Sequence, residues 1–271
     1  MNNIPISNKI PELDIAIKAA EKAGNAILEI YQKNYKTFTK TDDSPVTDAD
    51  LKSNKIINEI LSSTKYSILS EEDIDDQNRL SKDIIWIVDP LDGTSDFIDK
   101  TGEFTVMIAL VQNQKPILGV ISWPTEKILF VAQKNCGAFR YSNNKWEKIS
   151  VTKISELPKC RTIGSRHHLS DKEKNFIERI GIKKFTSIGS SLKVGKISSG
   201  EAEAYITTTN KMKEWDTAAS HCIISEAGGK MTDMLGNELT YNNKNVYHEN
   251  GILVTNGLIH DKILQEFKKL E

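Results

Sequence analysis

A run of apolar residues that leads directly into an acidic turn constrains this chain more than any other feature. Ile84–Val88 is five consecutive β-favouring apolar residues, which is typical of a buried strand. Asp89-Pro90 follows, and because proline lacks an N–H and has a fixed φ, we expect the strand to end there. Asp92-Gly93-Thr94 then predicts a helix start, with unpaired N–H groups and the positive end of the dipole facing outward. Carboxylates, a hydroxyl and amide donors in one small volume suit a hard cation held together with a phosphate.

The overall composition excludes several broad classes of protein. The chain has 271 residues, with 36 basic and 37 acidic side chains and a formal net charge of -1, so nothing favours a nucleic-acid polymer or an acidic membrane surface as partner. The three cysteines are far apart, which predicts no disulfide framework and no Cys-x-x-Cys metal site. No secretory signal and no apolar run of the ~20 residues needed to span a bilayer is visible. We expect a cytoplasmic monomer or homodimer.

The first part of the chain predicts two amphipathic helices. Apolar residues at three- and four-residue spacing indicate a helix that starts near Pro11. After a polar segment at Thr39–Ser44, expected to be a loop or a hairpin, a second helix should begin with Thr47 or Asp48 as N-cap. Its expected apolar face consists of Leu51, Ile57, Ile60 and Leu61.

The rest of the chain divides into an antiparallel meander and an alternating α/β segment. Ser67–Ser70 predicts a short strand that ends at Glu71-Glu72, and five strands with tight turns follow the central motif, at 105–111, 116–122, 127–132, 138–141 and 145–149. From Arg161 onward expected strands alternate with helices at 171–180, from 190, 216–227 and 258–269, which favours an α/β sheet. We therefore expect an α+β N-terminal subdomain at 1–150 and an α/β C-terminal subdomain at 151–271.

Acidic side chains occur at four places where strands end or helices begin: Asp50, Glu71-Glu72, Asp89 with Asp92, and Asp216. Taken singly, Asp50 or Asp216 is more typical of a helix cap. If these carboxylates converge, each pair at ~4 Å repels by up to ~4 kcal/mol at an effective dielectric of 20, unless cations lie between them. Every candidate ligand is an oxygen, which selects Mg²⁺, or Mn²⁺ as a substitute, over zinc or copper.

Three separated motifs give a specific family resemblance. Ser70-Glu71-Glu72, Asp89–Thr94 (DPLDGT) and Trp215–Ala219 (WDTAA) resemble the inositol monophosphatase superfamily of Mg²⁺-dependent, lithium-sensitive phosphatases. Three further stretches are more similar to its 3′(2′),5′-bisphosphate nucleotidases of the bacterial CysQ type. These are Ser44–Asp50, Gly102–Val106 with Ile108–Leu110, and Ser187–Lys193. The likeness extends from about the first helix to the last, and it implies a layered αβαβα sugar-phosphatase fold with two subdomains and a cleft between them.

The resemblance also implies a role for individual residues. Glu71, Asp89, the Leu91 carbonyl, Asp92 and Asp216 would hold two or three Mg²⁺ ions, with Asp89 bridging. Asp50 and Thr94 would orient and deprotonate the attacking water, with Glu72 in support. The substrate would contact the metal-site residues Glu71, Leu91, Asp92 and Asp216, the backbone of Gly93, Thr94 and Ser95, and the nucleotide-binding residues Ser190, Lys193 and His168.

Three departures from the nucleotidase pattern concern the substrate and leave the metal residues intact. Thr207 stands where these nucleotidases usually have a phosphate-contacting arginine, Met107 where they have asparagine, and Ser95-Asp96 where they have Lys-Glu. Lys193, Lys211 or Lys213 are the alternatives for replacing that arginine.

The resemblance predicts a phosphoric monoester hydrolase with a small phosphorylated substrate. The expected reaction is Mg²⁺-dependent hydrolysis of the 3′-phosphate of adenosine 3′,5′-bisphosphate to AMP and phosphate by an activated water, with no covalent phosphoenzyme. Two alternatives stay open: an inositol or other sugar monophosphatase on the same scaffold, and a non-catalytic phosphate- or metal-binding regulator.

Overall fold

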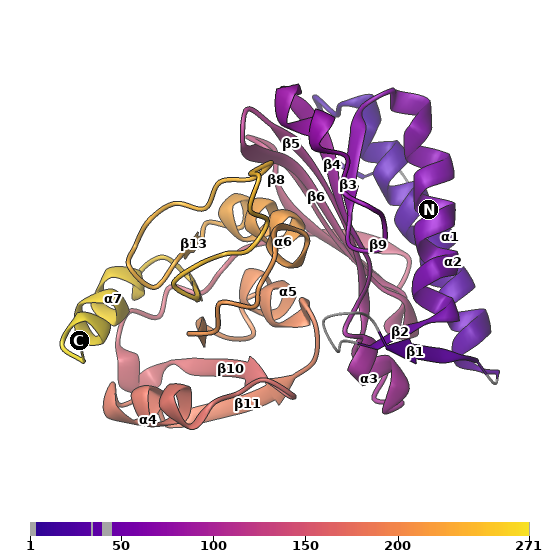
Figure 1. Cartoon of the computed structure of the whole chain (residues 1–271). Coiled ribbons are helices and arrows are strands. Elements are labelled where there is room, and N and C mark those ends of the chain that lie inside the picture. The colour runs from indigo at the N-terminus through magenta and orange to yellow at the C-terminus, as the bar shows by residue number, and fades with distance from the viewer. Residues whose placement is uncertain (1–3, 34, 40–44, 271) are drawn as a thin grey trace.

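Helices and sheets alternate in five layers. The computed structural model describes residues 4–33, 35–39 and 45–270. Helices α1 (Pro11–Tyr31) and α2 (Asp48–Leu61) cover one face of a seven-stranded sheet. Helices α5 (Leu192–Ser198) and α6 (Glu214–Glu226) lie between that sheet and a five-stranded one, whose far face carries α4 (Asp171–Arg179) and α7 (His260–Lys268) (Figure 1). The layered αβαβα fold expected from the sequence is confirmed.

The seven-stranded sheet has its strands in chain order, β3 to β9. The strands β3 and β4 are parallel and all later neighbours are antiparallel, so the predicted meander is confirmed. The strands are β3 (Ser67–Ser70), β4 (Ile84–Asp92), β5 (Thr105–Gln112), β6 (Lys115–Trp123), β7 (Ile128–Gln133), β8 (Gly137–Ser142) and β9 (Lys145–Ile149).

The five-stranded sheet has the order β11-β10-β12-β14-β13. The strand β10 is parallel to both its neighbours, whereas β14 is antiparallel to β12 and β13. The strands are β10 (Arg161–Ser165), β11 (Lys184–Ile188), β12 (Ala204–Thr207), β13 (Lys230–Thr232) and β14 (Ile252–Thr255). All strands of one sheet precede residue 150 and all strands of the other follow residue 160. The subdomain boundary at 150 itself stays a prediction.

The polar segment near residue 40 lies between the strands of a small hairpin. The strands β1 (Thr37–Thr39) and β2 (Pro45–Thr47) pair antiparallel. Residues 40–44, which include Ser44 of the nucleotidase-like motif and most of the expected loop, are outside the described part of the chain.

The helix α2 begins as predicted and buries Ile57 and Leu61 as expected, with Ile60 packed against the core, but one residue of the expected apolar face is exposed. Thr47 is the N-cap, and the side chain of Asp50 accepts a hydrogen bond from the Thr47 backbone N–H in a capping box. Leu51, expected on the apolar face, is 47% exposed. Small polar residues take its place: Ser53 Oγ donates to the Pro90 carbonyl at 2.7 Å, and Asn54 Oδ1 accepts from Ser70 Oγ at 2.8 Å.

The strand β4 does not end at Asp89-Pro90 as expected but continues to Asp92. Asp89 pairs with Met107 and Asp92 with Thr105, so three steps along β4 match two along β5. This register shift is a β-bulge, and it accommodates Pro90 because the ladder does not need an N–H from the extra residue. The strand thus carries both aspartates, and the five-residue helix α3 (Thr94–Ile98) follows.

Two further helix boundaries differ from expectation. The helix α6 begins at Glu214, which places Asp216 in its first turn rather than at its start. The helix α5 begins at Leu192 because Ser190 adopts a left-handed φ of 49°. None of the helices within the described ranges is long and apolar enough to cross a membrane.

Candidate active site between the two sheets

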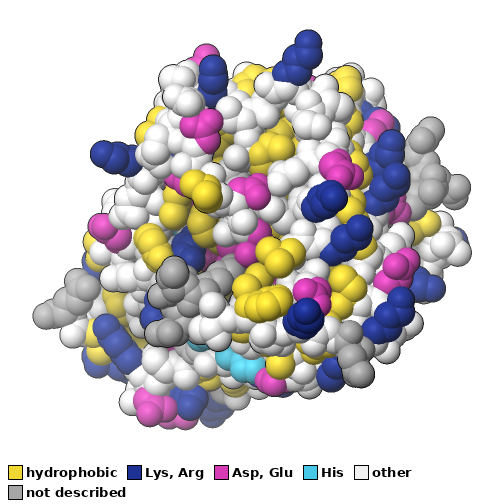
Figure 2. Space-filling view, turned by 45° about the vertical axis from the view of Figure 1, so that its right-hand side comes forward, with side chains coloured by type: hydrophobic (Ala, Val, Ile, Leu, Met, Phe, Trp, Pro, Cys, Tyr) yellow, Lys and Arg dark blue, Asp and Glu magenta, His cyan; other side chains and the backbone are white. Residues whose placement is uncertain are grey.

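A pocket of about 260 Å³ opens between the two halves of the chain, and residues from both line it. Glu71, Asp92 and the Gly93–Asp96 segment come from the N-terminal half. The C-terminal half contributes loops after β10, β11 and β12 and the start of α6. Acidic side chains lie in a recess near the middle of the face shown in Figure 2.

The topology of the seven-stranded sheet gathers Glu71 and Asp89. Because β3 and β4 are parallel and Ser70 pairs with Val88, the residues that follow emerge at the same end of the sheet. The Glu71 N–H donates to the Val88 carbonyl at 3.2 Å. Asp89 is 1% exposed, and its Oδ1 accepts from the Leu91 N–H at 3.0 Å.

The pKa values of three aspartates are raised, first because these groups are withdrawn from water. For Asp89 the charges of Glu71, Asp92, Asp216 and Glu72 add to this effect, and its pKa lies well above the ordinary value. Burial and the charge of Glu71 raise the pKa of Asp216 to about 8. Burial raises the pKa of Asp92 as well, whereas the nearby Lys193 ammonium lowers it. The carboxylates are therefore close enough to repel one another across the pocket.

Asp50 and Thr94 form a hydrogen-bonded pair at the edge of this acidic group. Thr94 Oγ1 lies 2.9 Å from Asp50 Oδ1 and 3.3 Å from the Leu91 carbonyl. Asp50 Oδ2 accepts from the backbone and hydroxyl of Thr47 at 2.8 and 2.6 Å. Burial raises the pKa of Asp50, and these hydrogen bonds oppose the shift.

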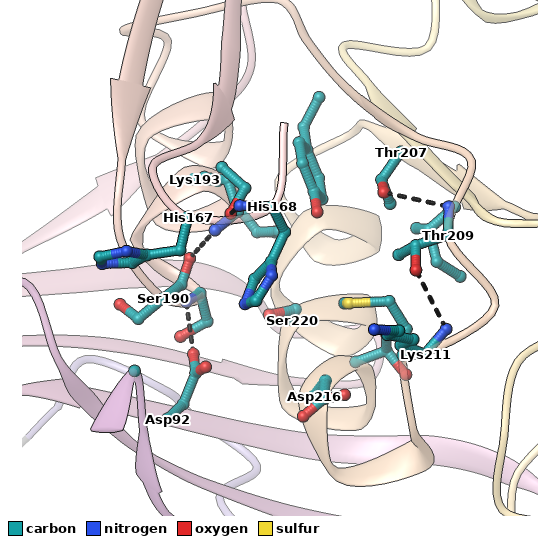
Figure 3. Close-up of a pocket in the computed structure, with 18 of the residues that line it drawn as sticks. Asp92, His167, His168, Ser190, Lys193, Thr207, Thr209, Lys211, Asp216 and Ser220 are labelled. Atoms are coloured by element: carbon teal, nitrogen blue, oxygen red, sulfur yellow. Dashed lines mark hydrogen bonds between the residues drawn. The ribbon is translucent and has the colours of Figure 1, made fainter. Parts of the chain in front are cut away.

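Ser190, Ser191 and Lys193 connect the C-terminal half to Asp92. The Ser191 N–H donates to Asp92 Oδ2, and Thr105 Oγ1 contacts the same oxygen at 3.2 Å. Lys193 is 7% exposed, and its ammonium donates to the Ser190 carbonyl at 2.5 Å. Figure 3 shows Asp92 and Ser190 on one side of the pocket and Thr207, Thr209, Lys211 and Asp216 on the other.

The chemistry of the acidic group fits a hard divalent cation. Its candidate donors are carboxylate oxygens of Glu71, Asp89, Asp92 and Asp216. Burial, and for Asp89 and Asp216 also the neighbouring negative charges, raises the pKa of the three aspartates, and a bound cation would stabilise their charged forms. Within the described residues, no three His, Cys, Asp or Glu side chains already stand together as a finished metal cluster.

The structure brings most of the expected site residues to one pocket. Its wall includes Glu71, Asp92, Gly93, Thr94, Ser95, His168, Ser190, Lys193 and Asp216. Asp50 and the Leu91 carbonyl contact the wall residue Thr94, and Asp89 is joined to Leu91 by a hydrogen bond from the Leu91 N–H. Glu72 is linked to the group through its charge, which acts on Asp89. The roles given to these residues stay predictions.

A charged network at the pocket rim was missed from the sequence. The Arg166 guanidinium contacts Asp96 at 3.2 Å and donates to Glu103, and His167 Nε2 lies 3.3 Å from Asp96. Asp96, noted only as a departure from the nucleotidase pattern, is 2% exposed and anchors this network. The charge of Asp96 and its position just after Gly93-Thr94 could have indicated a site residue. The local sequence could not identify Arg166 as its partner, because Arg166 is 70 residues away.

Known proteins share both this fold and this sequence. The model of the inositol monophosphatase family matches residues 9–271. The 3′(2′),5′-bisphosphate nucleotidase CysQ of Salmonella typhimurium is 36% identical over 90% of this chain and 99% of its own, and that of Escherichia coli K12 is 34% identical over the same shares.

Solved structures agree with these relatives. The crystal structure of CysQ from Bacteroides thetaiotaomicron is similar with a TM-score of 0.78 and 34% identity, over 90% of this chain and 96% of that one. The IMPase of Thermotoga maritima has a TM-score of 0.82 at 27% identity, over 96% and 98%. Fold and site thus define a protein of a phosphatase class. The chain belongs to the inositol monophosphatase family.

Proposed function

We propose that this protein is a Mg²⁺-dependent phosphatase that hydrolyses the 3′-phosphate of adenosine 3′,5′-bisphosphate to AMP and phosphate. The observation that carries the proposal is the convergence of Glu71, Asp92 and Asp216 on one pocket beside the Asp50–Thr94 pair. The bisphosphate nucleotidases that match 90% of the chain at 34–36% identity support the choice of substrate.

Divalent cations held by Glu71, Asp89, Asp92, Asp216 and the Leu91 carbonyl would supply an activated water and charge stabilisation for the phosphoryl group. Asp50, at 2.9 Å from Thr94 Oγ1, takes up the proton of the attacking water through that hydroxyl. The Thr47 hydrogen bonds hold Asp50 in place for this transfer. Glu72 adds its negative charge near Asp89.

The Gly93–Ser95 backbone receives the phosphate that is hydrolysed. Gly93 has a φ of 93°, and a Cβ there would lie 3.1 Å from Ser190 Cβ and 3.2 Å from the Glu103 carbonyl. Only glycine adopts this conformation without strain and leaves room for an oxygen to approach the backbone. Ser190, Lys193 and His168 line the adjacent wall, where the nucleotide would lie.

Of the three lysines that the sequence offered for a second phosphate, the geometry favours Lys211. The Lys193 ammonium is bound to the Ser190 carbonyl at 2.5 Å, and the Lys213 ammonium stacks over Trp215 and Tyr247 at 5.3 and 5.4 Å from the ring centres. Lys211 lines the pocket with Thr207 and Thr209, and among the described residues its side chain makes no ion pair. It therefore supplies the positive charge for the 5′-phosphate.

A substrate panel with purified protein and Mg²⁺ tests the proposal. We expect the highest kcat/KM for adenosine 3′,5′-bisphosphate, with no phosphate released from AMP. We also expect the activity to depend on Mg²⁺ or Mn²⁺ and to be lost in excess chelator. Millimolar Li⁺ should inhibit it. A higher kcat/KM for inositol 1-phosphate would instead establish a sugar monophosphatase, an alternative favoured by the fold similarity to the Thermotoga maritima IMPase. No release from any compound would favour a regulator.

A further inference from the structure

A buried arginine joins the two halves of the molecule behind the candidate metal ligands. Arg79 lies in the short helix η2 (Gln77–Ser81), on the segment between Glu71 and β4, and is 1% exposed. Its Nε and Nη2 donate to the two carboxylate oxygens of Asp75 at 2.6 and 2.8 Å. This bidentate pair fixes the guanidinium to the segment that carries Glu71.

The same guanidinium reaches the C-terminal half. Its Nη1 donates to Asn242 Oδ1 at 2.8 Å and its Nη2 to the Asn243 carbonyl at 2.9 Å. Asn242 Nδ2 donates back to the carbonyls of Arg79 and Lys82 at 3.0 and 3.2 Å. The contact is thus reciprocal, and it ties the segment between β13 and β14 to the segment after β3.

Glu214 continues the connection to α6. It is 1% exposed, and its carboxylate accepts from the Asn242 N–H at 2.7 Å and from the Asn243 N–H and Nδ2 at 2.8 and 2.9 Å. Glu214 is the first residue of α6, two positions before Asp216. A continuous series of contacts therefore runs from Asp75, four residues after Glu71, to the turn that presents Asp216.

The carboxylates of Glu71 and Asp216, which lie close in sequence to the two ends of this series, repel each other. Glu71 comes from the N-terminal half and Asp216 from the C-terminal half, and both line the pocket. Like charges that face each other across a pocket push its walls apart, and a rigid connection behind them opposes that motion.

We propose that Arg79 is a positioning residue that holds Glu71 and Asp216 on facing walls, so that it sets the affinity of the site for a divalent cation. The inference rests on the metal-binding role proposed above for these two carboxylates. It names no new ligand. It assigns a function to a buried network that touches neither substrate nor cation.

Thermal unfolding of the substrate-free protein over a range of Mg²⁺ concentrations tests the inference. In Arg79→Met we expect the Mg²⁺ concentration that gives half of the maximal rise in Tm to increase by about 10-fold or more. The Mg²⁺ concentration for half-maximal activity should shift by the same factor, whereas kcat at saturating Mg²⁺ should change less.

Arg161→Met is a control for the loss of an arginine–carboxylate pair elsewhere in the chain. Arg161 Nη2 donates to Glu203, which is fully buried, at 2.6 Å and to the Gly200 carbonyl at 2.9 Å, and it makes none of the contacts described here. This control should lower Tm without moving the Mg²⁺ midpoint. An unchanged midpoint in Arg79→Met, or an equal shift in both variants, would overturn the inference.

Asn242→Gly is a second variant if Arg79→Met does not fold. Asn242 has a φ of 63°, which glycine adopts freely, so only the side-chain contacts to Arg79 and Lys82 are lost. We expect a shift of about 3-fold in the same direction, and no shift would overturn the inference. A wild-type Tm that Mg²⁺ does not move would instead refute the metal role in the proposed function, a result distinct from failure of the Arg79 contacts alone.

Discussion

At the scale of single residues, the Asp92 carboxylate both lines the pocket and forms a hydrogen bond to the opposite half of the chain. It faces the pocket, and its Oδ2 accepts from the Ser191 N–H of the opposite half. Asp92→Asn keeps the size of the side chain but removes its charge. If several kcal/mol of transition-state stabilisation depend on that charge, kcat/KM should fall by about 10³-fold or more. Circular dichroism should show an unchanged fold, and a variant with wild-type kcat/KM would contradict the assignment.

Lys211 offers a prediction about substrate choice. Lys211→Met should raise KM for adenosine 3′,5′-bisphosphate by about 10- to 100-fold, because a hydrogen bond to a charged group contributes about 1.5–3 kcal/mol. KM for adenosine 3′-monophosphate, which lacks the 5′-phosphate, should change little. Lys172→Met is the control for general loss of charge, because the Lys172 ammonium lies 5.6 Å from the Phe267 ring centre and outside the pocket lining. Equal effects on both substrates would argue against a 5′-phosphate contact.

Only part of the site could be predicted from local sequence. The acidic residues of the central motif stood out because two aspartates surround a Pro-Leu pair directly after an apolar run. The contact between Asp50 and Thr94 spans 44 residues, so no spacing rule reaches it, and the expectation came from the family resemblance. The partners of Asp96 were not predicted for the same reason: Arg166 and His167 approach it only in the folded chain.

At the scale of elements, a close contact between a strand and a helix positions Asp216. An added Cβ at Gly119 of β6 would lie 2.4 Å from the Ala219 carbonyl of α6. Gly119→Ala should therefore lower the free energy of unfolding by about 2–3 kcal/mol and reduce activity, because α6 must move away from the sheet. Urea unfolding measures the first effect and kcat/KM the second.

Gly24→Ala provides the comparison for that measurement. Its added Cβ would meet the Pro124 ring at 3.1 Å, a contact that a small shift relieves, and alanine also favours the helix α1. We expect a change within about 1 kcal/mol and unchanged activity. If Gly24→Ala lowered the free energy of unfolding and kcat/KM as much as Gly119→Ala, the contact between Gly119 and α6 would have no special role.

Most elements followed from runs and periodicity, and the exceptions have identifiable causes. The strands of the meander were predicted because apolar runs alternate with short turns such as Asn113-Gln114 and Ser142-Asn143-Asn144. The continuation of β4 past Pro90 depends on pairing with β5, which local sequence does not contain. On α2 the prediction was wrong only at Leu51, which faces solvent, because Ser53 and Asn54 are buried in its place through hydrogen bonds to β4 and β3.

At the scale of the whole molecule, buried histidines make stability depend on pH. His260 is fully buried between Thr232 and Thr255, with ring nitrogens 2.8 and 2.9 Å from their hydroxyls, and burial lowers its pKa to about 4 from an ordinary 6.5. Between pH 4 and 6.5 the unfolded chain binds a proton that the folded chain does not. The contribution of His260 to stability is therefore present above pH 6.5 and is lost as the pH falls toward 4.

Comparison with His260→Gln isolates this contribution, since other groups titrate in the same range. The difference in unfolding free energy between wild type and His260→Gln should be constant above about pH 7 and should decrease toward pH 4. Urea unfolding at half-unit pH intervals measures it. A difference that is the same at pH 4.5 and pH 7 would exclude His260 as a source of acid sensitivity.

The bulge between Asp89 and Asp92 has a consequence for how this segment can vary in length. Surface loops absorb inserted or deleted residues, but here paired backbone on both sides leaves no slack. Residues three apart in a regular pleat point to opposite faces of the sheet, but the bulge pairs the two aspartates with Met107 and Thr105, which are two apart and share a face. The bulge and the two residues between the aspartates are thus linked: an even spacing needs no bulge, whereas the spacing found here needs one to keep both carboxylates on the same face.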